Sequence, residues 1–214
     1  MGDLVGPDDV TAATEAVAAA LEPAADDPER WGGPAGTLRW TCTATLAHAV
    51  DCLFWYAAAL ARRSTAGISV SEADPTGRPD VLVDSLRSGG ALLAIAVASA
   101  GPQDRGWHLF GSADRSGWAA MGADEVLIHG ADIAAGLGVS FVPPAGVADA
   151  VVRRLFPWAP TDGDAWSRLL WANGRAPLGD LPASRRWRFH CAPLAEWDGE
   201  VPTLGGKPPA APQA

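Results

Sequence analysis

Lysine is almost absent from this 214-residue chain: Lys207 is the only one, and every other basic residue is an arginine. Sixteen Lys and Arg stand against 25 Asp and Glu, which gives a formal net charge of −9. Nucleic acids and anionic membrane surfaces bind proteins through basic patches, so this deficit of positive charge argues against both as partners. The preference for arginine, with abundant Ala, Gly and Pro, indicates a GC-rich genome.

Cysteine is scarce too, since Cys42, Cys52 and Cys191 are the only three and none forms a CxxC pair. On one helix Cys42 and Cys52 would lie about 15 Å apart, too far for a disulfide. An odd count without a disulfide pattern is typical of a reducing compartment, so we expect a cytoplasmic protein. The first residues lack the basic and apolar regions of a secretory leader. The longest apolar run, at 91–100, is about half a bilayer span, so we expect no membrane partner.

Hydrophobic residues recur at helical spacing along most of the chain, which predicts an all-α fold. We expect helices at about 8–21, 40–63, 79–100 and 117–136, a further helix from Pro144 to before Pro157, and a short helix capped by Asp162 or Asp164. Loops rich in Gly and Pro separate them, including one of about seventeen residues at 101–117. The pattern predicts a four-helix bundle with long crossover connections.

The C-terminal part has a weaker pattern. Residues around Trp187 and Phe189 alternate loosely between apolar and polar, which is consistent with a short β segment packed on the bundle. We therefore expect a bundle domain at 1–175, an irregular extension at 176–202 and a disordered tail at 203–214.

The stretch EVLIHGAD places Glu125 and His129 four residues apart on an otherwise apolar helix, so the two side chains share one face. His48 lies in the middle of the helix expected at 40–63. If the two helices are neighbours, the three side chains converge on a His₂Glu metal site with an open position. Zinc is the first candidate, and nickel or iron accepts the same ligands. A buried hydrogen-bond network without metal also satisfies this spacing.

Each of these histidines is followed by an aspartate three residues later, Asp51 after His48 and Asp132 after His129. A carboxylate at that spacing can accept the second imidazole N–H and orient the ligand. It can equally cap or pair elsewhere.

Other residues are candidates for the walls of a pocket or for a substrate contact. The pocket candidates are Trp40, Cys52, Trp55, His108 and Trp118. Cys52 is a possible soft fourth ligand or a small buried hydrophobe, and Cys42, near a helix N-terminus, is a candidate nucleophile. The basic set Arg175, Arg185, Arg186 and Arg188 suits a substrate carboxylate or a solvated surface. No nucleotide-binding or nucleophile-elbow motif occurs in a suitable context.

Two segments together resemble a known family. TCTATLAHAVDCLFWYAAALA and HLFGSADRSGWAAMGADEVLIHGADIAAGLG are similar to the N-terminal domain of mycothiol-dependent maleylpyruvate isomerases, a DinB-like or YfiT-like metal-binding domain. The similarity extends over about 8–175. It implies a four-helix bundle with a long crossover and a divalent metal, usually zinc, held at the positions of His48, Glu125 and His129.

The resemblance also implies a chemistry. A low-molecular-weight thiol, mycothiol in actinobacteria, would bind the metal as a thiolate and attack a small electrophilic metabolite, giving transfer or isomerisation. The isomerase has a further C-terminal domain that supplies an arginine, and here only about 40 residues follow Arg175, so that residue does not carry over. A metal-assisted hydrolase and a non-catalytic metal- or ligand-binding protein remain the alternatives. We expect a monomer or homodimer.

Overall fold

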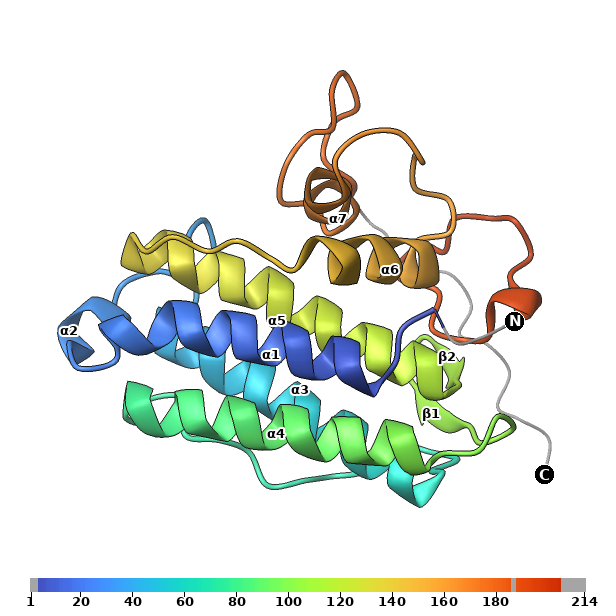
Figure 1. The fold of residues 1–214 in the computed structure, drawn as a ribbon, viewed down its shortest axis with the longest axis horizontal. Coiled ribbons are helices and arrows are strands. Elements are labelled where there is room, and N and C mark those ends of the chain that lie inside the picture. Colours follow the sequence, from blue (N-terminus) through green and yellow to red (C-terminus); the bar gives the residue numbers. More distant parts are fainter. Residues whose placement is uncertain (1–3, 186–187, 205–214) are drawn as a thin grey trace.

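The computed structural model describes residues 4–185 and 188–204. Over these residues the protein is mostly helical, with one small antiparallel sheet (Figure 1). The helices are α1 (Pro7–Leu21), α2 (Pro28–Trp31), α3 (Cys42–Arg62), α4 (Pro79–Ser99), α5 (Arg115–Leu137), α6 (Ala145–Leu155) and α7 (Ala165–Ala172). Every helix predicted from periodicity is present, with ends close to those expected. The short strands are β1 (Gly106–His108) and β2 (Gly111–Ala113).

Four long helices form a bundle around a single apolar core. Helix α1 packs against α4 and α5, and α3 packs against the same two helices, so α3 lies across the bundle from α1. Helix α6 covers α5, and α7 lies on α6 (Figure 1). This arrangement brings the middle of α3 directly against the middle of α5.

The helix ends follow from their capping residues. The Thr41 side chain accepts a hydrogen bond from the Ala44 N–H at the start of α3, and Asp114 does the same for Gly117 in α5. Asp164 caps α7, the second of the two residues predicted for that role. Gly138 ends α5 in the left-handed conformation, with φ of +64°. These caps fix where α3 and α5 begin and end.

Glycine lets two pairs of helices approach closely. A Cβ at Gly90 of α4 would lie 2.5 Å from Thr14 Oγ1 of α1, and one at Gly130 of α5 would lie 2.5 Å from Val17 Cγ2. Neither position has room for a side chain. Gly90 is therefore a contact point between helices, and α4 continues through it without interruption.

Three expectations about the connections were incomplete or wrong. The loop expected at 101–117 contains the β1–β2 hairpin, with Trp107 opposite Ser112. The loop expected after α1 contains a 3₁₀ turn and α2, a single helical turn too short to show periodicity. The described residues of the extension form no strand beyond an isolated bridge between Leu178 and Leu181. Arg186 and Trp187 of the expected β segment, and 205–214 of the expected tail, lie outside the described residues.

The connection from α3 to α4, residues 64–78, runs back along α3. Side chains of α3 hold it in place. The Trp55 indole N–H donates to the Ile68 carbonyl at 2.9 Å, and the Ala73 N–H donates to Asp51 Oδ1 at 2.7 Å. This segment therefore forms a wall beside the middle of α3.

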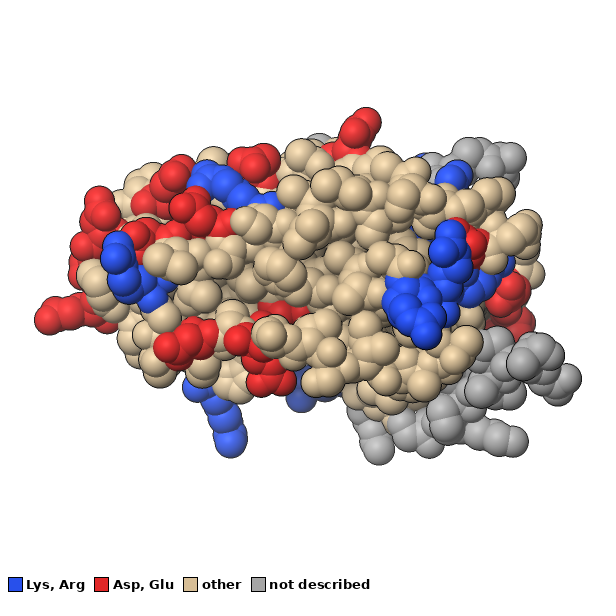
Figure 2. All heavy atoms as spheres, turned by 90° about the horizontal axis from the view of Figure 1, so that it is seen from below, with Lys and Arg blue, Asp and Glu red and all other residues tan. Residues whose placement is uncertain are grey.

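Helices α3 and α4 are long and apolar enough to cross a membrane by length and composition alone. Core helices of soluble proteins satisfy the same test, and 56% and 44% of their most apolar segments are buried in the protein. The face that carries α4 has a largely uncharged middle, with acidic side chains gathered toward the α2 end and arginine side chains at both ends (Figure 2). The expectation of no membrane partner stays a prediction.

Candidate metal centre

His48 of α3 and the Glu125–His129 pair of α5 meet where the two helices pack together. One ligand atom from each lies within 4.8 Å of the others. Glu125 Oε2 is 3.3 Å from His129 Nε2 and 3.8 Å from His48 Nε2, and the two imidazole rings are 5.2 Å apart between centroids. The convergence expected from helical spacing is therefore present.

The spacing of these atoms fits a metal ion. Bond lengths near 2.1 Å and tetrahedral angles place ligand atoms about 3.4 Å apart. The Glu125–His129 separation is close to that value, and the Glu125–His48 separation exceeds it by a few tenths of an ångström. The ligand nitrogens of the two imidazoles lie within 4.8 Å of each other and would move closer together around a metal ion. One carboxylate oxygen and two imidazole nitrogens are also the donor set of open, three-ligand zinc sites. The three residues could thus hold a divalent metal.

Tyr56 orients the carboxylate. Its hydroxyl donates to Glu125 Oε1 at 3.2 Å, which leaves Oε2 facing the two imidazoles. Tyr56 was not among the residues predicted for the site, although it is the only tyrosine in the chain and lies eight positions after His48 on the same helical face. The stripe of His48, Cys52 and Tyr56 was the available signal.

The two aspartates behave differently. Asp132 Oδ2 lies 3.3 Å from His129 Nδ1, though the pair is not aligned as a hydrogen bond, and it accepts a hydrogen bond from Arg175 Nη2 at 2.8 Å. Asp51 instead accepts the Ala73 N–H, and none of the described hydrogen bonds joins it to His48. A role for Asp132 in orienting its histidine is consistent with this geometry, while Asp51 influences His48 through its charge.

The pKa values of the three candidate ligands reflect their burial and the charged groups beside them. Burial alone lowers the pKa of His129, but the carboxylates of Asp132 and Glu125 beside its two ring nitrogens outweigh burial and raise that pKa to about 9. Burial raises the pKa of Glu125, yet the two histidines and the Tyr56 hydroxyl bring it below its ordinary value. Burial lowers the pKa of His48. A metal cation would take the place of the proton on His129.

Three of the pocket candidates, Trp55, His108 and Trp118, form one aromatic group with Tyr56 beside the site. Trp55, Tyr56, His108 and Trp118 make edge-on or tilted ring contacts with centroids 5.4 to 6.0 Å apart. Burial lowers the pKa of His108 to about 4, so it is neutral at neutral pH. Trp118 is fully buried and belongs to the core. Trp40 lies apart from this group, half exposed, with its ring 5.1 Å from that of His48.

The cysteines do not supply a nucleophile. Cys42 is fully buried among backbone carbonyls, and burial raises the pKa of its thiol, against the reading as a reactive thiolate. Cys52 Sγ lies 3.6 Å from His48 Nε2, close enough to contact a ligand imidazole, and burial raises the pKa of that thiol strongly. Cys52 therefore remains a neighbour of the cluster.

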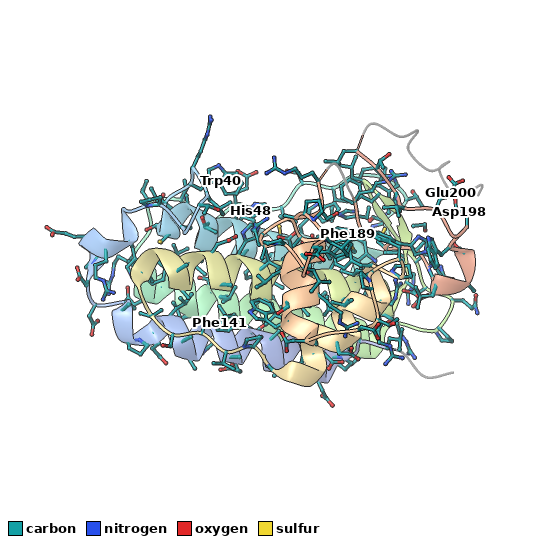
Figure 3. All side chains as sticks on the ribbon, turned by 90° about the horizontal axis from the view of Figure 1, so that it is seen from above. Trp40, His48, Phe141, Phe189, Asp198 and Glu200 are labelled. Carbon is teal, nitrogen blue, oxygen red and sulfur yellow. The ribbon has the colours of Figure 1, made fainter. Side chains whose placement is uncertain are left out.

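The cluster is reached from two sides. Toward α3, two cavities of about 290 and 260 Å³ lie beside the 64–78 segment, and both are lined by His48, Asp51 and Glu72. Toward the C-terminal segment, two cavities of about 550 and 240 Å³ are lined by Glu125, Asn173, Arg175 and Phe189. We call these the α3 opening and the C-terminal opening. Figure 3 shows Trp40 and His48 together near one edge of the bundle, with Phe189 further along and Asp198 and Glu200 at the far end.

The basic residues lie on the C-terminal side. Arg185 lines the larger cavity of the C-terminal opening, and Arg175 is held there by Asp132. Arg188 lines a separate cavity of about 420 Å³ with His190 and lies 5.9 Å from the Phe110 ring. Asp124, which sequence reasoning missed, is buried beside Glu125 and accepts a hydrogen bond from Asn173 Nδ2 at 2.8 Å.

Comparison with known proteins agrees with the assignment made from the residues. The model of the mycothiol maleylpyruvate isomerase N-terminal domain, a DinB-like domain, matches residues 10–134, more than half of the chain. Comparison with curated proteins and with solved structures gives no significant match. The matched range contains His48, Glu125 and His129 and ends before Arg175. This chain belongs to the mycothiol maleylpyruvate isomerase N-terminal domain family.

Proposed function

We propose that this protein is a cytoplasmic metal-dependent enzyme that uses a low-molecular-weight thiol, with mycothiol as the first candidate, to transfer to or isomerise a small electrophilic metabolite. His48, Glu125 and His129 hold the divalent metal, for which zinc is the first candidate. The observation that carries the proposal is the convergence of two imidazole nitrogens and one carboxylate oxygen within 4.8 Å of one another. The family match supports the thiol.

The chain's own residues have two roles: some hold the metal ligands in place, and others limit the access of water. The bound metal supplies the acidity that makes a coordinated thiol a thiolate at neutral pH. Tyr56 keeps one oxygen of Glu125 turned toward the imidazoles, and Asp132 keeps His129 in place. The aromatic group of Trp55, Tyr56 and His108 limits the access of water from its side.

Two openings onto one cluster suit a reaction between two molecules. A thiol and an electrophile that arrive from opposite sides meet without displacing each other. Addition of the thiolate sulfur to one carbon of a conjugated C=C bond breaks the π bond and leaves a carbanion. Protonation of this carbanion gives the thiol adduct, which is the transfer product. Rotation about the former double bond followed by loss of the thiolate re-forms the double bond and gives the isomer.

The metal is tested by elemental analysis of protein purified without chelator. We expect close to one equivalent of a divalent transition metal in the natural chain and less than about 0.2 equivalent in His48→Ala. His190→Ala is the matched control, because His190 bonds to the Pro193 carbonyl away from the cluster. Equal, low metal in all three proteins would refute the metal site.

The reaction is tested by following mycothiol consumption with monochlorobimane and other electrophiles, with and without EDTA. We expect turnover that EDTA abolishes and added zinc restores. Bound metal without any thiol-dependent turnover would instead support the hydrolase or the non-catalytic binding protein.

A further inference from the structure

The α3 opening differs in chemistry from the C-terminal opening. None of the residues that line its two cavities is a lysine or arginine, whereas Asp51 and Glu72 line both. No described residue forms a hydrogen bond or ion pair with the Glu72 carboxylate, and Glu72 is exposed at the mouth. A molecule that enters here meets acceptors of hydrogen bonds and a negative potential.

Trp40 adds a flat apolar surface to this opening. Its indole is 49% exposed and contacts the ring of His48, so it lies directly beside a candidate metal ligand. Its indole N–H makes no hydrogen bond to any described residue. A half-exposed tryptophan leaves part of its apolar ring surface in contact with water. A ligand with an apolar face would bury that surface on binding, which is favourable.

We propose that the α3 opening is the binding site for the thiol, and that Trp40, Asp51 and Glu72 select a thiol that is uncharged and rich in hydroxyl groups over anionic thiols. The C–H face of a sugar or cyclitol ring packs on the Trp40 indole. Its hydroxyl groups donate to the two carboxylates, and the sulfur reaches the cluster past His48. This inference rests on the proposed function and assigns one side of the same site.

The opening selects between thiols by their charge. A thiol with a net negative charge, such as glutathione, would approach two carboxylates, and no Lys or Arg among the residues that line the opening offsets the repulsion. Hydroxyl groups gain charge-assisted hydrogen bonds from the same carboxylates. The electrophile is left with the C-terminal opening, where Arg185 is available in the larger cavity.

Binding measured by calorimetry on the metal-loaded full chain tests the assignment without requiring turnover. Mycothiol, glutathione and cysteamine are titrated separately into the natural chain and the variants. We expect mycothiol to bind at least about ten-fold more tightly than glutathione or cysteamine, from the stacked ring and its hydroxyl contacts. Trp40→Ala should weaken mycothiol binding by about ten-fold.

Glu72→Gln keeps the shape and removes the charge. It should weaken mycothiol binding by about five-fold and narrow the preference over glutathione. Arg185→Ala, on the opposite opening, is the matched control and should leave mycothiol affinity unchanged. Both Trp40 and Glu72 are solvent-exposed, so neither variant disturbs the core.

Glutathione or cysteamine binding as tightly as mycothiol would overturn the inference. So would Trp40→Ala and Glu72→Gln with natural affinity, or a loss of affinity in Arg185→Ala alone. Metal content and turnover are measured on the same samples. Mycothiol binding with the expected variant pattern but without turnover would support this site while refuting the proposed enzyme.

Discussion

Replacing Asp124 by asparagine should make the protein more stable at alkaline pH. Asp124 is 4% exposed, and its carboxyl lies on α5 beside Glu125. Burial, followed by the charge of Glu125, raises the pKa of Asp124 to about 7 from an ordinary 3.8, despite the hydrogen bond from Asn173. Between these two pKa values, the carboxyl group of Asp124 therefore keeps its proton in the folded protein and has lost it in the unfolded chain.

The direction and the size of this stability difference follow from the linkage between protonation and folding. Because the folded pKa is the higher one, the stability that protonation contributes is fully present below about pH 3.8 and is lost as pH rises to about 7. Three pKa units correspond to about 4 kcal/mol, an upper bound because a buried carboxylate relaxes its surroundings. Asparagine is neutral at every pH, so Asp124→Asn should gain about 2 to 4 kcal/mol over the natural chain at pH 8 and nearly nothing at pH 4.

Urea unfolding of both proteins between pH 4 and 9, with EDTA present, measures this difference. Asp164→Asn is the control. The N–H groups of α7 lower the pKa of Asp164, so it stays ionised from pH 5 to 9 and its variant should show a constant offset. A difference for Asp124→Asn that is constant across the same range, or that falls as pH rises, would refute the reasoning.

Three further substitutions test the packing and the site. Tyr56→Phe removes the hydroxyl that orients the candidate carboxylate ligand and should weaken metal affinity about ten-fold, measured by chelator competition. Arg175→Met removes the hydrogen-bonded cation of the buried Asp132 carboxylate, leaves that carboxylate beside the His129 imidazolium, and should cost about 1 to 3 kcal/mol in urea unfolding at pH 7; an unchanged free energy of unfolding would contradict this. Gly90→Ala drives a methyl group into Thr14 and should lower the free energy of unfolding by about 1 to 3 kcal/mol; an unchanged midpoint would show that α1 moves aside freely.

The main helices were predictable because each buries one face for several turns. Periodicity therefore located α1, α3, α4, α5 and α6. The β1–β2 hairpin was missed since its strands are three residues long, too short to establish alternation. Helix α2 has a single turn and gave no periodic signal either.

The candidate ligands were predictable for a similar reason. Four-residue spacing places Glu125 and His129 on one face, and only a neighbouring helix could supply His48. The partners of these residues depend on tertiary packing. The ion pair of Arg175 with Asp132 joins positions 43 residues apart, and no local pattern indicates it. Likewise, Asp51 was expected at His48, but its hydrogen bond goes to the backbone of a loop whose path the sequence does not specify.

The residues that match the family model and the residues that follow them border different parts of the candidate site. The candidate ligands, Tyr56 and the α3 opening all come from within residues 10–134, while Asn173, Arg175 and Phe189, which border the C-terminal opening, come from beyond it. Replacement of the later segment would therefore leave all three candidate ligands in the chain, and would reach them only through contacts such as that of Arg175 with Asp132, which lies beside His129. The candidate ligands and the residues that shape the C-terminal opening can thus change separately in evolution.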